Sequence, residues 1–308
     1  MANKSHHNLV NRDVFFGVAF ALLAAVGFSA KAILVKLAYH DSVDAVTLLA
    51  LRMAFSVPFF IGVALWSRRQ HAEPLSGHDR MLVLALGLVG YYLSSFLDFL
   101  GLQYISAGLE RLILFLYPTM VVILSALLYK RAIDGKVVVA MALSYAGIVL
   151  VFLHDTGMRQ EGILLGGSLV FASTLSYSIY LVGAGHAIRR IGSTRFTAYA
   201  MVVASTASLL QFVAMRPMAA LDLPLRVYEL AIGMAVFSTV LPVFLLSYAI
   251  RRIGSGNASL IGSIGPVSTI GMAYVFLHEQ VSLLQIAGSI LVLAGVLTIS
   301  ANSNRAVK

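Results

Sequence analysis

Long apolar runs separated by short polar segments make up most of the chain. A helix that crosses the hydrocarbon core of a bilayer needs about 20 apolar residues. Ten runs approach or exceed that length, at residues 14–38, 45–66, 80–101, 106–129, 136–153, 162–185, 195–215, 227–250, 257–277 and 281–301. The runs are continuous rather than alternating, which excludes a transmembrane β-barrel. The pattern therefore predicts an all-α integral membrane protein with ten transmembrane helices.

Composition strengthens this prediction. The 308 residues are 59% hydrophobic and only 11% charged, against about 25% charged in soluble domains. A chain with so few charged residues cannot cover a surface that faces water. Most of its surface must therefore face lipid. The net charge of +9 lies in short clusters between the apolar runs, a distribution typical of membrane orientation rather than of nucleic-acid binding.

The distribution of lysine and arginine predicts the orientation. With a cytoplasmic N-terminus, 15 of these residues fall in inside segments and three in outside loops, and the other four lie within or at the ends of the spans. The three outside residues are Arg159, Arg216 and Arg226. We therefore expect a multi-pass protein of the bacterial inner (plasma) membrane, with cytoplasmic tails at residues 1–13 and 302–308.

The two halves of the chain resemble each other. A shift of 148 residues aligns Pro118 with Pro266 and Ile105 with Ile253, and a shift of 149 aligns Gly17 with Gly166. Each half, 14–153 and 161–301, holds five predicted spans. Because five is odd, the halves must enter the membrane in opposite orientations. Such inverted five-helix repeats around a central cavity are typical of alternating-access carriers.

Two segments carry a family resemblance. The sequence GLQYISAGLERLILFLYPTMVVILSALLYKR at 101–131 resembles the third and fourth helices of EamA-type members of the drug/metabolite transporter superfamily. Residues 248–296 repeat the pattern and contain a similar closing signature, with Leu277, His278 and Glu279 followed by Gly288. The resemblance implies ten helices in an inverted repeat, a central cavity, and movement of small metabolites, often by export. It does not identify the substrate.

Five charged residues lie well inside predicted spans, where a charge costs at least about 2.5–3.5 kcal/mol. They are Lys31, Arg52, Asp98, Glu110 and Arg111. All five belong to the first repeat and, at about 1.5 Å of rise per residue, all fall in the external half of the membrane. The residues at the matching positions of the second repeat are uncharged: Tyr180, Met201, Leu246, Ala258 and Ser259.

Three cations and two carboxylates at similar depth are able to pair. One hypothesis is an external gate, formed by Arg52, Asp98, Glu110 and Arg111 together with Lys31, in which Asp98 or Glu110 carries a proton. The other hypothesis is a static brace that holds the first four helices together. The sequence leaves both open.

Polar and aromatic side chains at helical spacing predict the cavity wall. Tyr91, Ser95 and Asp98 share one face of the third span, and Tyr177 and Tyr180 lie in the sixth. The predicted cavity residues are Lys31, Tyr91, Ser95, Tyr177, Tyr180 and Gly262. The alternatives are ordinary helix packing for the serine and an interfacial belt for the tyrosines.

Proline interrupts the fourth and ninth spans. Pro118 and Pro266 lack an N–H, which frees the carbonyl groups of Leu114 and Gly262. The prolines either form hinges or fix kinks that serve packing, since both occur in membrane helices.

These observations favour a secondary transporter that moves a small polar or zwitterionic metabolite, such as an amino acid, driven by protons or by the substrate's own gradient. Export follows from the family resemblance alone. The alternative is a membrane-embedded enzyme acting on a lipid-linked substrate, for which Asp98 and Glu110 are the candidate acid and base. We expect no catalytic residue, metal site, cofactor or nucleic-acid partner, and a monomer or weak homodimer in the lipid bilayer.

Overall fold

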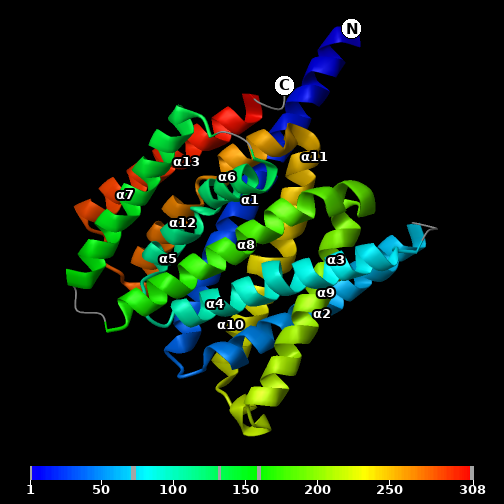
Figure 1. Ribbon diagram of the computed structural model, residues 1–308. Coiled ribbons are helices and arrows are strands. Elements are labelled where there is room, and N and C mark those ends of the chain that lie inside the picture. Colours follow the sequence, from blue (N-terminus) through cyan, green and yellow to red (C-terminus); the bar gives the residue numbers. More distant parts are fainter. Residues whose placement is uncertain (1, 71–73, 131–132, 158–160, 306–308) are drawn as a thin grey trace.

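The computed structural model describes residues 2–70, 74–130, 133–157 and 161–305, and the regular structure in these ranges is helical (Figure 1). The helices of the first half are α1 (Ala2–Tyr39), α2 (Ala45–Gln70), α3 (Gly77–Gly87), η1 (Leu88–Leu93), α4 (Ser94–Gly101), α5 (Ala107–Leu114), α6 (Tyr117–Tyr129) and α7 (Gly135–Gly157). Those of the second half are α8 (Ile163–Ile191), α9 (Ser193–Met215), η2 (Met218–Leu221), α10 (Leu225–Ala235), η3 (Val236–Val240), α11 (Leu241–Gly262), α12 (Gly265–Met272), η4 (Ala273–Leu277) and α13 (Leu283–Arg305).

Eight helical stretches in the described ranges are long and apolar enough to cross a membrane, so the chain is a multi-pass membrane protein. The predicted ninth and tenth spans correspond to two shorter apolar helices, Gly265–Leu277 and Leu283–Ile299. The chain breaks directly before Pro266, between α11 and α12. Of the predicted tails, residues 1 and 306–308 lie outside the described residues, as do Arg131 and Arg159 among the counted cations.

Four helices of the second half begin at a constant distance from helices of the first. The starts that lie 148 residues apart are Ala45 and Ser193, Gly77 and Leu225, Tyr117 and Gly265, and Gly135 and Leu283. Two wide π-helical turns, η1 and η3, share this spacing at Leu88 and Val236. Lys130 and His278 share it too, and both end their helices in the left-handed conformation, with φ values of 50° and 55°. The order of helices therefore recurs, and so does local backbone geometry that propensity alone does not dictate.

Each proline follows the same kind of break. The Leu116 amide donates to the Ile113 carbonyl at 3.1 Å, and the Ile264 amide donates to the Ile261 carbonyl at 3.2 Å. These are tight bonds that span three residues instead of four. Pro118 and Pro266 then stand in the first turns of α6 and α12, where a missing N–H costs no helical hydrogen bond.

Close helix contacts depend on small residues. α7 and α13 lie side by side (Figure 1), and a Cβ on Gly147 of α7 would lie 2.5 Å from the Gly288 carbonyl oxygen of α13. The same contact forms in reverse, because a Cβ on Gly288 would lie 2.5 Å from the Gly147 carbonyl oxygen. Glycines allow the two backbones to approach in this way, as in other membrane helix pairs.

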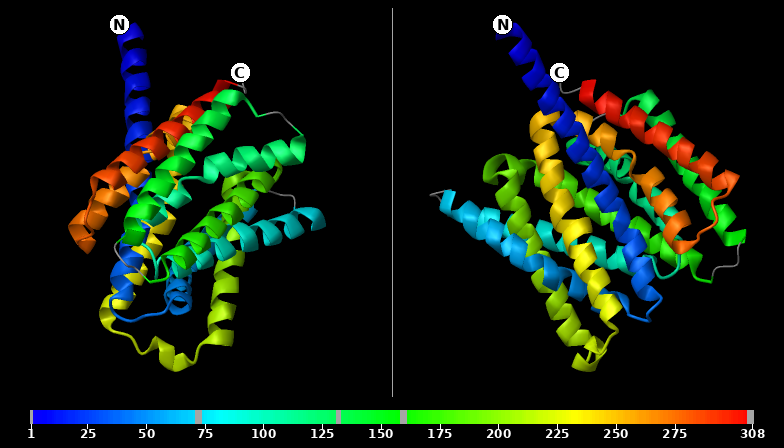
Figure 2. Two further views of the ribbon diagram at one scale, coloured as in Figure 1. Left: turned by 60° about the vertical axis from the view of Figure 1, so that its left-hand side comes forward. Right: turned by 180° about the vertical axis from the view of Figure 1, so that it is seen from behind.

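The largest buried apolar cluster surrounds the charged residues of the first half. Its fully buried members include Val35 of α1, Leu48 of α2, Phe99 of α4 and Met234 of α10. Helix α1 runs beside α11 through the middle of the molecule (Figure 2), and its start lies at the same end as the end of α13. This core holds α1 between the two halves, with its charged side chain among their polar groups.

Candidate functional site

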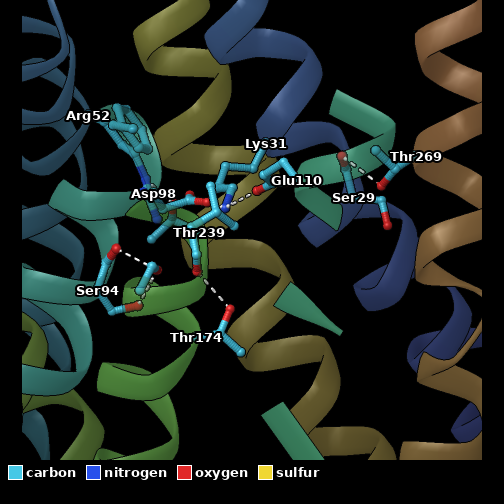
Figure 3. Close-up of polar contacts among 12 residues, drawn as sticks. Ser29, Lys31, Arg52, Ser94, Asp98, Glu110, Thr174, Thr239 and Thr269 are labelled. Carbon is cyan, nitrogen blue, oxygen red and sulfur yellow. Dashed lines mark hydrogen bonds and ion pairs between the residues drawn. The ribbon is translucent and has the colours of Figure 1, made fainter. Parts of the chain in front are cut away.

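One lysine joins two carboxylates at the centre of the site (Figure 3). The Nζ atom of Lys31 on α1 lies 2.5 Å from Oδ2 of Asp98 on α4 and 3.0 Å from Oε1 of Glu110 on α5. The carboxylate side chains are 3% and 0% exposed. A buried charge needs a partner of opposite sign, and here one cation serves two anions. Three helices are thereby tied together at one point.

The start of α5 is built to place Glu110. Ser106 precedes the helix and accepts a hydrogen bond from the Leu109 amide at 3.1 Å. Glu279, from the other half of the chain, accepts a second bond from the Ala107 amide at 3.0 Å. These caps satisfy amide groups that have no partner inside the helix. Glu110 then lies in the first turn, where the helix dipole favours an anion.

Arg52 on α2 does not share this lysine-centred cluster but connects it to the second half. Its Nε donates to Oγ1 of Thr239 on η3 at 3.0 Å, and its guanidinium carbon lies 5.5 Å from the centroid of the Phe99 ring. Figure 3 shows Arg52 approaching Asp98 from the side opposite Lys31. The arginine is thus held by a hydroxyl and a ring face, both of which suit a weakly hydrated guanidinium.

Arg111 is directed elsewhere. The ion pairs of the described residues do not include it, and its Nε is buried without a hydrogen-bond partner among them. Its Nη2 lies against Gly265 of α12, 2.6 Å from where a Cβ on that glycine would stand. Although Arg111 directly follows Glu110 and lies within electrostatic range of its carboxylate, the described residues show no ion pair between the two.

Four tyrosines form a connected aromatic cluster, which we call the tyrosine cluster: Tyr91, Tyr117, Tyr177 and Tyr180. The hydroxyls of Tyr91 and Tyr180 lie 3.0 Å apart, and their ring centroids lie 4.9 Å apart. Tyr177 stacks on Tyr180 at 5.6 Å and meets the Tyr117 ring edge-on at 5.9 Å. Tyr117 was not predicted from the sequence as a site residue. Its position, one residue before Pro118, is the signal that could have identified it.

The remaining predicted cavity residues are placed separately. Ser95 is partly exposed, whereas its neighbour Ser94 contacts Ser173 of α8, with the two hydroxyls 3.2 Å apart. A Cβ on Gly262 would meet no atom within 4 Å, so open space adjoins this glycine at the end of α11. The structure therefore brings Tyr91, Tyr177 and Tyr180 into one cluster, to which no hydrogen bond or ring contact among the described residues joins Ser95 or Gly262.

Serines on α1 and α8 make matching contacts across the halves. Ser29 donates to the Gly265 carbonyl at 3.0 Å, and Ser178 donates to the Tyr117 carbonyl at 3.3 Å. The serines are 149 residues apart and the carbonyl groups 148 residues apart. Each half therefore fixes the helix break of the other. The sequence offered this signal, since the shift of 149 aligns the two serines.

The same shifts relate the two polar groups of the site. Lys31 corresponds to Tyr180, and Thr239 corresponds to Tyr91. The lysine-centred cluster and the tyrosine cluster therefore share one repeat position, that of Lys31 and Tyr180, whereas Asp98 and Glu110 correspond to Leu246 and Ala258. One cluster is charged and the other is neutral and aromatic.

With this geometry established, comparison with known proteins is informative. Residues 15–153 and 164–301 each match the EamA-like transporter family. This chain belongs to the EamA-like transporter family. Uncharacterized transporter YcbK of Bacillus subtilis is 29% identical over 282 residues, which cover 90% of either chain. An uncharacterized transporter of Archaeoglobus fulgidus is 26% identical over 287 residues, covering 93% of this chain and 97% of its own.

A solved crystal structure of 16% identity aligns with this EamA-like chain at a TM-score of 0.64, over 95% of this chain and 99% of its own. That likeness concerns the fold alone. The family match and the named relatives make the chain a membrane transporter, with a small-molecule substrate as the family implies. They also favour a protein that is not an enzyme.

Proposed function

We propose that this EamA-like protein is a secondary-active transporter that works by alternating access and exports a small polar or zwitterionic metabolite, such as an amino acid. It would lie in the inner membrane of a bacterium with both termini in the cytoplasm. The observation that carries the proposal is the exchange of contacts between halves: Ser29 holds the break before Pro266, and Ser178 holds the break before Pro118.

Exchanged contacts of this kind are expected of an inverted repeat. A Cβ on Gly166 would lie 2.8 Å from Cγ2 of Ile105, and a Cβ on Gly17 would lie 2.5 Å from Cγ2 of Ile253. The two glycines occupy one repeat position and the two isoleucines another. Each contact joins a glycine of one half to an isoleucine of the other half. A pseudo-two-fold axis produces such reciprocal pairs, and ten helices in two inverted fives would place the axis in the membrane plane. Units 14–153 and 161–301 would then rock against each other.

The lysine-centred cluster is our candidate for the external gate. By the predicted orientation it lies in the external half of the membrane, and its ion pairs tie α1, α4 and α5 together. Opening the gate would separate Lys31 from at least one carboxylate. A separated carboxylate in a membrane is costly unless it takes up a proton. We therefore propose that Asp98 or Glu110 couples opening to proton binding.

The tyrosine cluster would close the internal side. Its Tyr180 occupies the repeat position of Lys31, and the cluster has no charge to separate. Its rings and hydroxyls would part without leaving a bare ion in the membrane. The two gates would therefore respond differently to pH, with only the external one sensitive to protonation. Pro118 and Pro266 would act as hinges at the breaks beside the tyrosines.

Transport is tested by counterflow into liposomes. The purified protein is reconstituted, and labelled amino acids and other small metabolites are screened with and without a pH gradient. Accumulation of at least one solute is expected. If no solute accumulates under any condition, the carrier proposal is wrong.

The coupling role is tested with Asp98→Asn and Glu110→Gln. We expect at least one of them to abolish pH-driven accumulation while counterflow without a gradient persists. If both variants keep pH-driven transport but lose thermal stability, the charged residues are a static brace and not a gate.

The orientation is tested by labelling, because the sequence has no cysteine. Thr194→Cys lies at the exposed start of α9 and Ala219→Cys lies in the exposed turn η2. An impermeant maleimide added to intact cells is expected to label the second position and not the first. The reverse pattern would overturn the predicted orientation.

A further inference from the structure

Arg111 is a cation in an apolar membrane helix that lacks the partner such a cation needs. The described residues give it no ion pair, and its Nε is buried without a hydrogen bond among them. Its neighbour Glu110 is already engaged by Lys31 at 3.0 Å. Charged residues in membrane spans pair with another charge or mark the path of a substrate.

Glu110 and Asp98 lie within electrostatic range of Arg111 without forming an ion pair with it, and the guanidinium itself packs against a helix start. Its Nη2 and Nε approach Gly265 most closely, at 2.6 Å and 3.3 Å from the place of a Cβ. Gly265 begins α12, and that helix start has no side-chain cap. The first amide groups of a helix carry partial positive charge. A guanidinium held against an uncapped helix start repels it, unless an anion binds beside the two.

Contacts from α1 fix the position of the start of α12. Ser29 on α1 donates to the Gly265 carbonyl at 3.0 Å, and Thr269 of α12 approaches the Ser29 carbonyl at 3.5 Å (Figure 3). The glycine has no side chain that could shield the guanidinium. Arg111 and the start of α12 are therefore in direct contact.

A wall for the rest of a ligand lies close by. The electrostatic environment of Arg111 includes the hydroxyls of Tyr117 and Tyr177, both partly exposed residues. Tyr117 begins α6, two residues past the break after α5, so one ring and one cation flank that break. Tyrosine offers both a ring face and a hydroxyl, which suits a ligand with apolar and polar parts.

The other two membrane cations have more polar partners than Arg111. Lys31 has two carboxylates, and Arg52 has the Thr239 hydroxyl and the Phe99 ring. Arg52 also keeps a buried Nη1 without a hydrogen-bond partner, but only Arg111 of the three has a side chain that makes neither an ion pair nor a hydrogen bond among the described residues. Guanidinium matches a carboxylate with two parallel hydrogen bonds, which makes a carboxylate the best-fitting small anion.

We infer that Arg111 binds the carboxylate group of the transported solute, at the point where the helix breaks of the two halves approach each other. The inference rests on the proposed transport function, and it narrows the substrate to carboxylate-bearing solutes. The carboxylate lies beside the guanidinium, next to its contact with the start of α12, and the remainder of the solute lies against Tyr117 and Tyr177. In this proposal Arg111 binds the substrate and is not a member of the external gate.

The test compares each acid with its own derivatives. The probes are the L-amino acids and short monocarboxylates, each with its carboxamide and, for amino acids, the decarboxylated amine. Binding is measured as thermal stabilisation of the detergent-solubilised protein, and transport as competition in counterflow. We expect wild type to prefer the acid over its carboxamide by at least about 30-fold, the scale of a lost buried charge contact.

Three variants separate binding from structure. Arg111→Gln is expected to abolish the preference for acid over carboxamide, and Arg111→Lys to retain part of it. Gly265→Ala is expected to raise the half-saturation concentration with little loss of stability, because the new methyl group meets only the flexible end of Arg111. A purely structural arginine would lower stability in Arg111→Gln without changing the preference.

The outcomes distinguish the two proposals. If wild type transports solutes but treats acid, carboxamide and amine alike, the role of Arg111 is wrong while transport stands. A preference for acids that survives in Arg111→Gln also overturns this role. If no probe accumulates and none stabilises the protein, both proposals fail.

Discussion

Replacing Lys31 by methionine is expected to destabilise the protein more than any other single loss of a cation. Methionine is similar in length and apolar, so it fills the space but leaves the two carboxylates without the lysine that joins them. Lys31 Nζ now lies 2.5 Å and 3.0 Å from them, and their side chains are 3% and 0% exposed. Breaking a buried ion pair by removing one partner costs about 3–5 kcal/mol. We expect Lys31→Met to fall in that range.

A second substitution should restore part of this loss. Glu110→Gln removes one of the two stranded charges, so the double variant Lys31→Met with Glu110→Gln should be more stable than the two single effects predict. Residues in direct contact show interaction energies of about 0.5–3 kcal/mol. With one cation serving two anions, we expect a value in the upper half of that range.

The assay is thermal unfolding of the purified protein in detergent. For a chain of this size, about 2 °C of Tm accompanies each kcal/mol, so Lys31→Met should lower the Tm by roughly 6–10 °C. The matched control is Lys36→Met on the same helix, since Lys36 takes part in none of the ion pairs of the described residues. An equal effect of the two substitutions, or strict additivity in the double variant within about 0.5 kcal/mol, would refute the shared ion pair.

Two further predictions concern helix packing and the α2 start. Gly288→Ala should cost about 1–3 kcal/mol of stability, because its Cβ would stand 2.5 Å from a carbonyl oxygen of α7. The control Gly271→Ala meets open space and should be neutral or stabilising in the same unfolding assay. Equal effects of the two substitutions would contradict the tight contact. Partial burial works against the ionised form of Asp44, but hydrogen bonds from Thr47 and Arg216 lower the pKa of its carboxyl. Its stabilisation is then present above the ordinary value of 3.8 and is lost as the pH falls through the lowered pKa. The Tm difference between wild type and Asp44→Asn should therefore be seen at pH 6 and close in strong acid, and a difference that grows in acid would show the opposite shift.

Hydropathy and the basic residues indicated the helical membrane fold, because the energetic demands of lipid leave few alternatives. The ninth span shows the limit. Its apolar run is continuous at 257–277, so hydropathy hides the break that hydrogen bonding and Pro266 create. Proline identified the break but not the length of helix on either side of it.

Depth along the membrane predicted which charges lie near one another but not which of them touch. Lys31, Asp98 and Glu110 do meet, as similar depth allowed. Arg111 lies at the same depth, yet one residue along a helix turns the side chain by about 100°, and this directs it to Gly265 instead. Facing direction depends on helix rotation, which the packing of neighbouring helices decides.

The central claim is that the two halves alternate, and paired labelling tests it most directly. Ser95 and Val243 occupy equivalent positions of the two halves and are both partly exposed, so Ser95→Cys and Val243→Cys report the external and internal sides in this cysteine-free chain. Labelling by an impermeant maleimide is compared in otherwise wild-type protein and after Lys31→Met, which breaks the proposed external gate. We predict that Ser95→Cys gains access from outside while Val243→Cys loses access from inside. If access changes at neither position, or rises at both, the two sides are not coupled and the alternating-access account is wrong.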